Sequence, residues 1–598
     1  MATIRSPKFP PQQHAGMLWL AGSMAARTSS PVRVAVLMDG PAAPVWVHQT
    51  IGEILRAEHL ELSLLMMKAY DGKAGNSAPV LLRAWTWADR QLFKDYVDAL
   101  ALERREYAVD TIVACPAHPG SGALMVSKDD EARIKAANLD VIVNLTSDAA
   151  PAHMKTCARF GVWTFLSNGG EPESDYAHFQ DIFENNRIST LTLRAVSSNA
   201  EVDLYRSTFA NDALSGYRNR NATCWRKSQI FLRLLSDLYQ KGWPALQVAN
   251  STVDGVLDPA DKPVLPGTAE MTRFLQRWSL QTSRRWLSNL AFSERWFIAY
   301  QDKHPISDQS ASLKMIIPPN DWHYADPFLY ERSGRHYVFF ETASRYQSAN
   351  EIWFVELDEN GNPSLPERAL RRGYNLSYPF IFDCQGETYL MPESSQNRTV
   401  EIYRATEFPR RWELAGTLLA NVPAVDGTLF ERDGKFWLFA AGIGGEHLKC
   451  SELSLFFSDS LFGPWIAHPK NPIVCDIRRA RPAGRLFYES GELIRPGQNG
   501  AECYGHAISL NRVEVLSETD YHETTISTIL PDWAPGLSAT HTLNMDSRYD
   551  VLDGKSRTTR YGFATGARGF SMKWPVGHRM EAPAKDPAAV PGLGLETH

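Results

Sequence analysis

The C-terminal half of this 598-residue chain repeats itself five times. Each repeat is an apolar strand, a polar turn and a second strand, with enough chain after it for two more strands. Successive repeats start 52, 48, 57 and 57 residues apart, at Asp326, Tyr378, Asp426, Ala483 and Thr540. A period of about 50 residues with four short strands is typical of a propeller blade. We therefore expect a five-bladed β-propeller over residues 291–575 and a disordered tail over residues 576–598.

Blade geometry predicts which side chains meet at one mouth of the central channel. The first strand of a blade lies at the channel and the second runs back beside it, so the first and last positions of each repeat share a rim. The first position contributes Asp326 and Asp426, and the last contributes Glu341 and Glu393. We expect these four carboxyl groups to converge and to be the catalytic residues of a site.

The propeller half resembles the five-bladed propellers of glycoside hydrolase family 43. It resembles still more the propeller region at the N-terminus of plant glucosamine inositolphosphorylceramide transferases. The motifs that carry this resemblance are "YADPF" (324–328), "VDGTLF" (425–430), "ARPAGRLF" (480–487), "LIRPGQN" (493–499) and "THTLN" (540–544). The likeness to the hydrolases implies that Asp326 is a base and that Asp426 tunes a proton affinity. Their acid opens the fourth blade, where this chain has "RRARPAGRLF". A guanidinium cannot lend a proton at neutral pH, which argues against simple hydrolysis.

The arginines of the fourth blade suggest a different reaction. Guanidinium groups hold phosphate or carboxylate oxygens, so Asp326 would orient or deprotonate a sugar hydroxyl while the arginines hold a nucleotide or lipid phosphate leaving group. The residues that we expect to bind substrate are Arg481, Arg485, Arg495, Gln498, His541, Tyr378 and Tyr324. Two alternatives stay open. The arginines form structural pairs with the carboxylates, or Glu341 or Glu393 acts as an acid because crowded like charges raise its proton affinity.

Residues 31–245 form the pattern of an α/β domain. "PVRVAVLMD", "VWVHQTIGEILRAEHL" and "LELSLLMM" predict a β-α-β unit, and "VDTIVACP" and "LDVIVNLT" predict two more buried parallel strands. A charged amphipathic stretch over residues 93–106 separates the second strand from the third. A helix over residues 224–244 closes the domain, and residues 246–290 are expected to be a linker. The pattern favours a Rossmann-like, open doubly wound sheet.

The order of these elements resembles the fold of methionyl-tRNA and sugar N-formyltransferases. The segment "LDVIVNLTSDAAPAHMKTCARFGVWTFLSNGG" is similar to the part of that family in which a strand leads through a helix to "G-x-x-N-x-H". The resemblance implies formyl transfer from a folate, assisted by an Asn, a His and an Asp. This chain has Thr164 and Leu166 at the "N-x-H" positions, and the Asp position falls near Asn199. Leucine cannot move a proton, so we expect a retained scaffold with a lost or altered reaction and no folate.

Charge and cysteine content exclude several partners. A net charge of -6 provides no field that would gather nucleic acid. The seven cysteines form no CxxC pair, which indicates free thiols in a reducing compartment and no metal site. No apolar run reaches the roughly 18 residues that a membrane helix needs. We expect a disordered leader over residues 1–30 and a cytoplasmic protein, with export through "GMLWLAGSMAA" as the alternative.

These observations favour a carbohydrate-active transferase of glycan or glycoconjugate biosynthesis. Its partner would be a sugar, a sugar phosphate or a nucleotide sugar, with no firmly implied cofactor. The alternatives are a one-carbon transferase similar to the sugar N-formyltransferases, a glycan-binding protein without turnover, and a furanosidase-like hydrolase. The oligomeric state is not indicated by the sequence.

Overall fold

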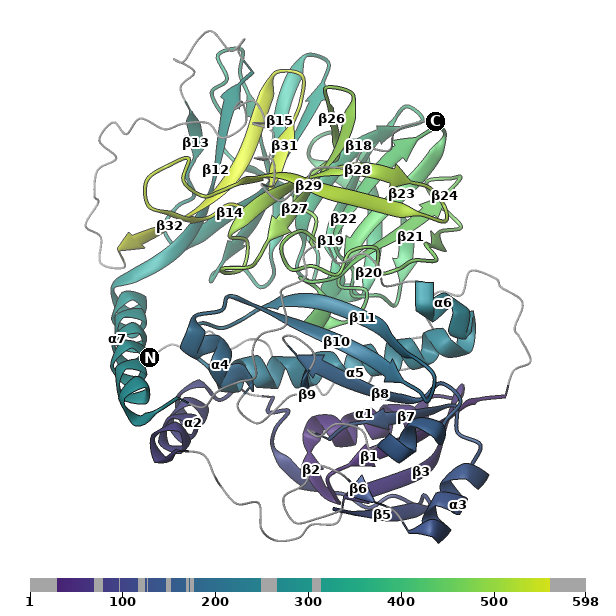
Figure 1. The fold of residues 1–598 in the computed structure, drawn as a ribbon. Helices are drawn as coiled ribbons and strands as arrows, with labels where there is room; N and C mark the ends of the chain where they lie inside the picture. Colours follow the sequence, from purple (N-terminus) through teal and green to yellow (C-terminus); the bar gives the residue numbers. More distant parts are fainter. Residues whose placement is uncertain are drawn as a thin grey trace, which may run out of the picture.

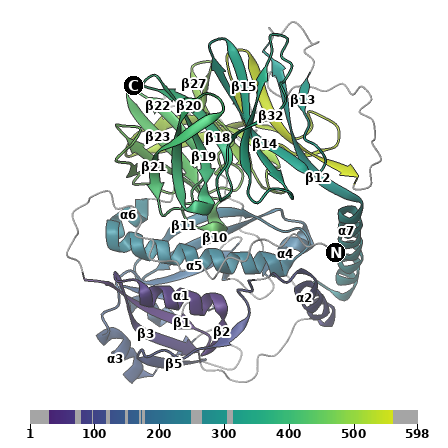
Figure 2. The same cartoon turned by 180° about the vertical axis from the view of Figure 1, so that it is seen from behind.

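A computed structural model describes residues 30–68, 79–95, 97–116, 124–125, 127–146, 152–167, 171–172, 177–248, 266–303 and 313–559. Residues 1–29 of the expected leader, residues 249–265 of the expected linker and the whole expected tail lie outside this part. The chain forms an N-terminal α/β domain and a β-propeller, the latter at the top of Figure 1. Figure 2 shows the same two bodies from behind.

The N-terminal domain is built on a mixed, mostly parallel sheet. The strand order is β11-β10-β8-β7-β1-β3-β5-β6, and β9 pairs with β8. The five parallel strands are β1 (Val32–Met38), β3 (Leu60–Lys68), β5 (Thr111–Pro116), β7 (Val141–Asn144) and β8 (Val162–Ser167). The antiparallel members are β6 (Leu124–Met125), β9 (Glu171–Pro172), β10 (Ile188–Val196) and β11 (Glu201–Ala210). A separate small ladder joins β2 (Ala42–Pro44) to β4 (Leu102–Arg104).

Helices cover both faces of this sheet. The helices of this domain are α1 (Val45–Arg56), α2 (Val80–Phe93), α3 (Lys128–Ala136), α4 (Ala177–Glu184), α5 (Gly216–Lys241), α6 (Trp243–Val248) and α7 (Thr268–Ala291). Alternate residues of β1 enter different cores. Val34 and Val36 pack in the cluster that contains α1 and α5, whereas Ala35 and Leu37 pack in the cluster that contains Ile134 of α3. Strands buried on both faces read as continuous apolar runs, which is why they were visible in the sequence.

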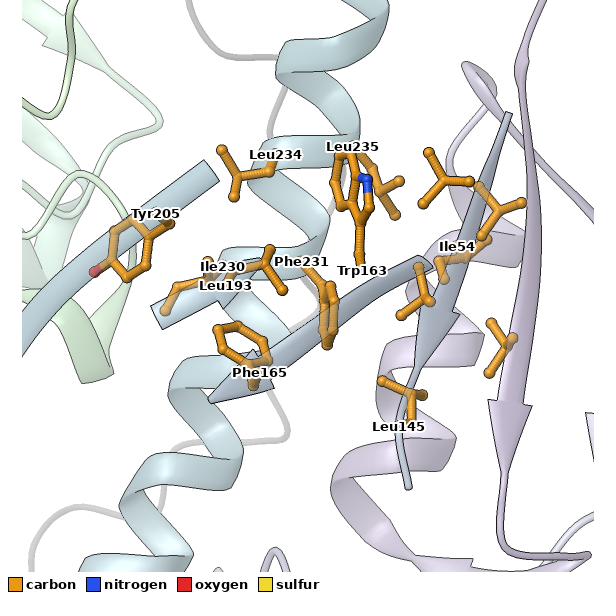
Figure 3. Packing of buried hydrophobic residues seen from close by; sticks show 14 of the residues in the cluster. Ile54, Leu145, Trp163, Phe165, Leu193, Tyr205, Ile230, Phe231, Leu234 and Leu235 are labelled. Carbon is orange, nitrogen blue, oxygen red and sulfur yellow. The ribbon is translucent and has the colours of Figure 1, made fainter. Parts of the chain in front are cut away.

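Helix α5 packs its apolar face on the sheet and on α1. Figure 3 shows Ile230, Phe231, Leu234 and Leu235 of this helix beside side chains of the neighbouring strands. Phe231 is fully buried, and its ring meets that of Phe165 edge-on at a centroid distance of 4.6 Å. Truncating such a buried aromatic residue to alanine costs about 3–5 kcal/mol. The helix ends at Lys241 because Gly242 follows with a φ of 79°.

Three features of this domain differ from the sequence expectation. The sheet is mixed rather than purely doubly wound, because the β10–β11 hairpin adds two antiparallel strands. Helix α2 ends at Phe93, so residues 93–106 are not the crossover helix; the helix precedes them. The second half of the expected linker forms α7, which packs on α2. The resemblance to formyltransferases stays a prediction; Thr164 and Leu166 both lie in β8.

The C-terminal half is a propeller of five blades. The first is β14 (Trp322–Arg332), β15 (Arg335–Ser344), β16 (Glu351–Leu357) and β17 (Glu367–Leu370). The second is β18 (Ser377–Cys384), β19 (Glu387–Ser394), β20 (Thr399–Glu407) and β21 (Arg411–Ala420). The third is β22 (Val425–Arg432), β23 (Lys435–Ala441), β24 (Leu453–Ser458) and β25 (Ile466–Ala467). The fourth is β26 (Phe487–Glu489), β27 (Glu492–Asn499), β28 (Ala507–Leu516) and β29 (Tyr521–Ile529).

The fifth blade joins both ends of the propeller. It contains β12 (Phe292–Asp302), β13 (Lys314–Ile316), β30 (Leu537–Ala539), β31 (Leu543–Met545) and β32 (Tyr549–Thr559). The first long strand, β12, pairs with the last, β32, from Phe292↔Thr559 to Asp302↔Tyr549. This pairing of the first and last strands of the propeller closes the ring of blades, so no sheet edge is left open between the first and last repeats. The predicted five-bladed architecture is therefore confirmed.

The two domains meet through buried polar contacts. Tyr205 of β11 donates a hydrogen bond of 2.7 Å to Glu452, and Arg233 of α5 pairs with the same carboxylate. Thr208 donates to Asp476 at 2.8 Å, and their backbones form an isolated bridge. Both views place β10, β11 and α5 between the rest of the N-terminal domain and the propeller (Figures 1 and 2). The halves are therefore docked on each other rather than joined only by chain.

Candidate functional site at the propeller mouth

The innermost strands of three blades contain the same distortion. Asp326, Tyr378 and Asp426 have φ values of 51°, 45° and 53°, in the left-handed region that non-glycine residues rarely adopt. Each lies where its strand loses register with the next strand of the blade, which marks a β-bulge. Such backbone strain costs on the order of 1 kcal/mol or more per residue and clusters at functional sites. The bulges change the direction of the side chains at the channel mouth.

The four predicted carboxyl groups lie together at this mouth. Asp326 and Asp426 are buried, and Glu393 keeps only 14% of its side chain exposed. Glu393 accepts hydrogen bonds from the Ser395 hydroxyl at 2.6 Å and from the backbone N–H of Asp426 at 3.3 Å. Glu341 accepts from the Asn350 amide. The four carboxyl groups therefore lie close together at one rim, as the repeat register predicts. Their catalytic roles stay predictions.

Burial and crowding keep protons on the two glutamates. Burial raises the pKa of Glu393 to about 8, and the neighbouring charge of Asp426 adds to the effect. Burial, Asp326 and Glu393 raise the pKa of Glu341 well above its ordinary value. Burial also raises the pKa of Asp326, although the charge of His541 opposes this. The mouth therefore contains carboxylic acids that can donate protons at neutral pH.

Arg481 and Gln498 hold the remaining carboxylate. Arg481 donates through Nε and Nη2 to the two oxygens of Asp426, the second at 3.2 Å, and its Nη2 lies 3.9 Å from Glu393 Oε2. Gln498 Nε2 donates to Asp426 Oδ2 at 3.0 Å. For Arg481, this geometry favours the alternative in which the arginine forms a structural ion pair with a carboxylate. Among the residues that the structure describes, Nη1 of Arg481 contacts only the Cys450 sulfur, at 3.9 Å, so it is the donor left for a ligand.

A second polar network surrounds Asp326. Thr542 donates to Asp326 Oδ1 at 2.8 Å, and His541 Nδ1 lies 2.5 Å from Asp553 Oδ2. Burial alone would lower the pKa of His541, but the charges of Asp553 and Asp326 outweigh it and raise the pKa. One ligand atom from each of Asp326, His541 and Asp553 lies within 4.8 Å of the others. Within the described ranges, these side chains could together hold a divalent cation, if His541 gave up its contact with Asp553.

Two of the predicted binding residues, Arg495 and Arg485, make their contacts outside the carboxylate cluster. Arg495 is buried and binds both oxygens of Glu523, because it is three residues from Gln498 on β27 and points to the opposite face of the strand. Arg485 donates to the Ile381 carbonyl, and its guanidinium lies 4.6 Å from the Phe380 ring centre. These two arginines therefore do not join Arg481 in one phosphate site, which corrects the sequence expectation.

The two predicted tyrosines are both buried. Tyr324 is 4% exposed, and its ring centre lies 4.7 Å from that of Phe340 in a hydrophobic cluster. The Tyr378 hydroxyl contacts Thr428 at 2.9 Å and accepts the backbone N–H of Gly484 at 2.7 Å, so it joins the second, third and fourth blades. Gly484 has a φ of 131°, and an added Cβ would lie 1.9 Å from the Leu543 carbonyl oxygen. The glycine of "ARPAGRLF" is thus required by close packing.

Tyr504 is a site residue that the sequence analysis missed. Half of it is exposed, in the turn between β27 and β28, and the Arg481 guanidinium lies 5.2 Å from its ring centre. Its ring also meets the His541 ring edge-on at 5.7 Å. Burial and the charges of Asp426 and Asp326 raise the pKa of its phenol well above the ordinary value, despite the opposing charge of Arg481. An exposed aromatic ring beside acids and an arginine is the geometry that sugar stacking uses.

The mouth that contains the cluster faces the N-terminal domain. Val425 pairs with Ala441, so the loop after β23 leaves from the Asp426 rim. In that loop, Gly444 lies against Arg233 and Gly445 against Gln229, both on α5. On the same side, Glu502 pairs with Arg187 at 3.2 Å. The N-terminal domain therefore borders the mouth.

Comparison with known proteins relates the propeller to one family. The family model described as "Glucosamine inositolphosphorylceramide transferase 1, N-terminal" matches residues 303–553. Residues 303–553 are therefore similar to that domain. The transferase of Arabidopsis thaliana is 38% identical over 233 residues, which are 38% of this chain and 30% of the relative. That of Oryza sativa subsp. japonica is 35% identical over 219 residues, 36% of this chain and 29% of the relative. The chain thus spans about a third or less of these curated relatives.

The solved structures that match have lower sequence identity. A family 117 glycoside hydrolase of Zobellia galactanivorans matches with a TM-score of 0.30 and 12% identity, over 44% of this chain and 91% of that chain. The arabinanase of Bacillus subtilis matches with a TM-score of 0.28 and 13% identity, over 39% and 93%. The assignment of five blades is based on the strand pairing described above and not on these TM-scores. In the described ranges, no helix has the length and hydropathy to cross a membrane. The cytoplasmic location stays a prediction.

Proposed function

We propose that this protein is a carbohydrate-active transferase of glycan or glycoconjugate biosynthesis that binds its sugar at the propeller mouth. The observation that carries the proposal is the cluster of Asp326, Glu341, Glu393 and Asp426 around one arginine. Proton donors, a carboxylate and a guanidinium within one partly buried site are the groups that glycosyl transfer needs. Similarity of residues 303–553 to a domain of named transferases supports the same class.

Each charged group has a role in the proposed reaction. Asp326 accepts the proton of the acceptor hydroxyl while the acceptor oxygen forms its bond to the anomeric carbon. Glu393, whose pKa is about 8, donates its proton to the leaving oxygen as the old glycosidic or phosphate ester bond breaks. Arg481 Nη1 stabilises the charge of a leaving phosphate. Tyr504 packs against the apolar face of the sugar.

The names of the relatives suggest the substrate class. They refer to glucosamine and to inositolphosphorylceramide, which combine an amino sugar with a lipid that carries a phosphate. We propose that this chain likewise handles a sugar and a phosphate-bearing partner. A site with one arginine donor left for a ligand beside protonated carboxyl groups suits a phosphate whose charge would be repelled by ionised glutamates.

A ligand screen followed by a transfer assay tests the proposal. Thermal unfolding of the whole protein is measured with nucleotide sugars, sugar phosphates and free sugars, since a ligand that binds the native state raises Tm. Transfer from each hit is then followed with Asp326→Asn and Glu393→Gln, and with Asp459→Asn as control, because Asp459 is exposed at the outside of the third blade. We expect turnover to fall at least about 100-fold in the first two and to persist in the control. Full turnover in Asp326→Asn and Glu393→Gln would contradict the proposed roles.

One observation favours a second candidate, a glycan-binding protein without turnover. Asp426 is saturated by Arg481 and Gln498, which leaves it unable to act on a ligand. This candidate predicts that Asp326→Asn changes sugar affinity while no donor tested supports transfer. The screen and the assay together separate the two candidates.

A further inference from the structure

The last turns of α7 expose a row of large apolar side chains. Leu280, Trp286, Leu287 and Leu290 are 59%, 66%, 64% and 54% exposed, and we call these four residues the α7 stripe. Successive residues of an α-helix are rotated by about 100°, so the four side chains fall within an arc of about 120°. A contiguous apolar stripe of this width on a helix normally faces a core or a partner.

The α7 stripe is separate from the face that holds the helix in place. Met271, Phe274 and Trp278 are buried against α2, where Trp85 meets the rings of Phe274 and Trp278 at 5.5 and 6.2 Å. These three positions are rotated by about 155° from the centre of the stripe. Burial of the first turns therefore leaves the stripe uncovered. Figures 1 and 2 show α7 at one side of the molecule, between α2 and the propeller.

The charges beside the stripe are basic. Helix α7 contains four arginines and one acidic residue, in a chain whose net charge is -6. Arg277 binds the carbonyls of Ile182 and Phe183, and Arg285 lies 3.8 Å from Asp212. Arg273 and Arg284 form no ion pair with any residue that the structure describes. Both are exposed and lie on one flank of the stripe, at about 20° and 40° from Leu280.

We propose that the α7 stripe docks on the surface of a membrane that contains anionic lipids. A helix with Trp and Leu on one face and arginines beside it lies in the interface plane, with its apolar side chains among the acyl chains and its guanidinium groups at the headgroups. Each basic residue near an anionic surface adds attraction that salt screens. A second copy fits less well, because antiparallel pairing through the stripe would place the Arg273–Arg284 flank against the same flank of the copy.

The position of α7 relates this surface to the proposed site. The helix ends at Ala291 and continues into β12, where Trp296 stacks on His541 of the mouth at 4.1 Å. Five residues of extended chain span about 16 Å. A membrane bound by the stripe would therefore lie close to the mouth, where a lipid-linked partner is expected if the proposed function is correct. The docking surface itself does not depend on that function.

Vesicle flotation of the full chain tests the proposal. Vesicles of phosphatidylcholine with about one third phosphatidylserine are compared with pure phosphatidylcholine at roughly 0.1 M salt. We expect Trp286→Ala/Leu290→Ala to bind anionic vesicles at least about tenfold more weakly than wild type. Arg273→Glu/Arg284→Glu should lose a similar factor at low salt. The matched control is Tyr488→Ala/Leu414→Ala, which removes equally exposed side chains (59% and 54%) from the propeller and should bind as wild type does.

Several outcomes would overturn the proposal. Wild type that stays unbound with anionic vesicles, or a stripe variant that binds as well as wild type, removes the membrane surface. A concentration-dependent dimer that light scattering detects in wild type and not in Trp286→Ala/Leu290→Ala would assign the stripe to a second copy instead. Sugar binding is measured in the same samples. Loss of vesicle binding with intact sugar affinity separates failure of the surface from failure of the proposed function.

Discussion

Replacing Glu393 by Gln should stabilise the propeller, and the gain should grow with pH. The Glu393 side chain is 14% exposed, and burial raises its pKa from 4.5 to about 8. The unfolded chain ionises this carboxyl near 4.5, whereas the folded chain keeps the proton until pH 8. Glu393 therefore does not lower the free energy of unfolding below pH 4.5. As the pH rises from 4.5 toward 8, the free energy of unfolding falls by about 1.4 kcal/mol per pH unit. Gln cannot ionise and escapes this loss.

The magnitude follows from the two pKa values. The loss is about 1 kcal/mol at pH 5.5 and at most about 5 kcal/mol at pH 8 and above. Arg481, 3.9 Å away, can move toward an ionised carboxylate and offset part of the loss, so we take about half of these values as the lower end of the expected range. At about 2 °C per kcal/mol for a domain of this size, Glu393→Gln should raise Tm by roughly 5–10 °C at pH 8.5 and by roughly 1–3 °C at pH 5.5.

Thermal unfolding at the two pH values measures the effect. The control is Glu387→Gln on the same strand, whose side chain is 50% exposed and whose replacement should shift Tm little at either pH. Equal shifts of Glu393→Gln at both pH values, or a variant that unfolds earlier than wild type at pH 8.5, would refute a protonated Glu393.

Three further predictions concern the rest of the site and the interface. Tyr504→Ala should weaken sugar binding by about 1 kcal/mol, roughly fivefold in Kd by calorimetry, while Tyr504→Phe keeps most of the affinity because the ring provides the contact. Arg233→Met leaves Glu452 buried without its cation, so it should cost about 3–5 kcal/mol in chemical unfolding, and Arg233→Met/Glu452→Leu should recover much of that loss. Asp553→Asn removes the charge that raises the pKa of His541, so the imidazole titration followed by NMR should move to lower pH. Equal sugar affinities of the two Tyr504 variants would contradict stacking on the ring. A double variant as unstable as Arg233→Met would contradict the role of the Arg233–Glu452 pair. An unchanged titration midpoint of His541 would contradict its interaction with Asp553.

The blade repeats made most of the site accessible from sequence. Apolar strands at a period of about 50 residues determine both the fold and the register, which is why Asp326, Glu341, Glu393 and Asp426 were found without coordinates. The bulges were not visible, because the residues with a positive φ are Asp and Tyr and not Gly, which is the residue that usually marks such a position. A bulge at Asp326 interrupts the alternation of β14, so Tyr324, two residues earlier, enters the core instead of sharing its face.

Other residues and strands that the sequence analysis misplaced or missed differ in how clearly the sequence marks them. The alternation along β27 would have excluded Arg495, because a residue three positions from Gln498 faces the other way. The sequence of β10, ISTLTLRAV, partly alternates polar and apolar residues, a strand signal that is weaker than the continuous apolar runs of the parallel strands. Tyr504 lies in a turn, where no periodicity fixes the direction of a side chain. Its proximity to Arg481 depends on how two blades and a loop pack, which one chain's sequence does not determine.

A crystal structure of the protein with the sugar donor identified by the thermal screen tests the central claim most directly. The measured quantity is the distance between the bound sugar and the carboxyl oxygens at the propeller mouth. We expect sugar hydroxyls within hydrogen-bonding distance of Asp326, with Tyr504 against the sugar ring and a phosphate at Arg481. A donor bound only within the N-terminal domain, or on the outer surface of a blade, would contradict a sugar site at this mouth.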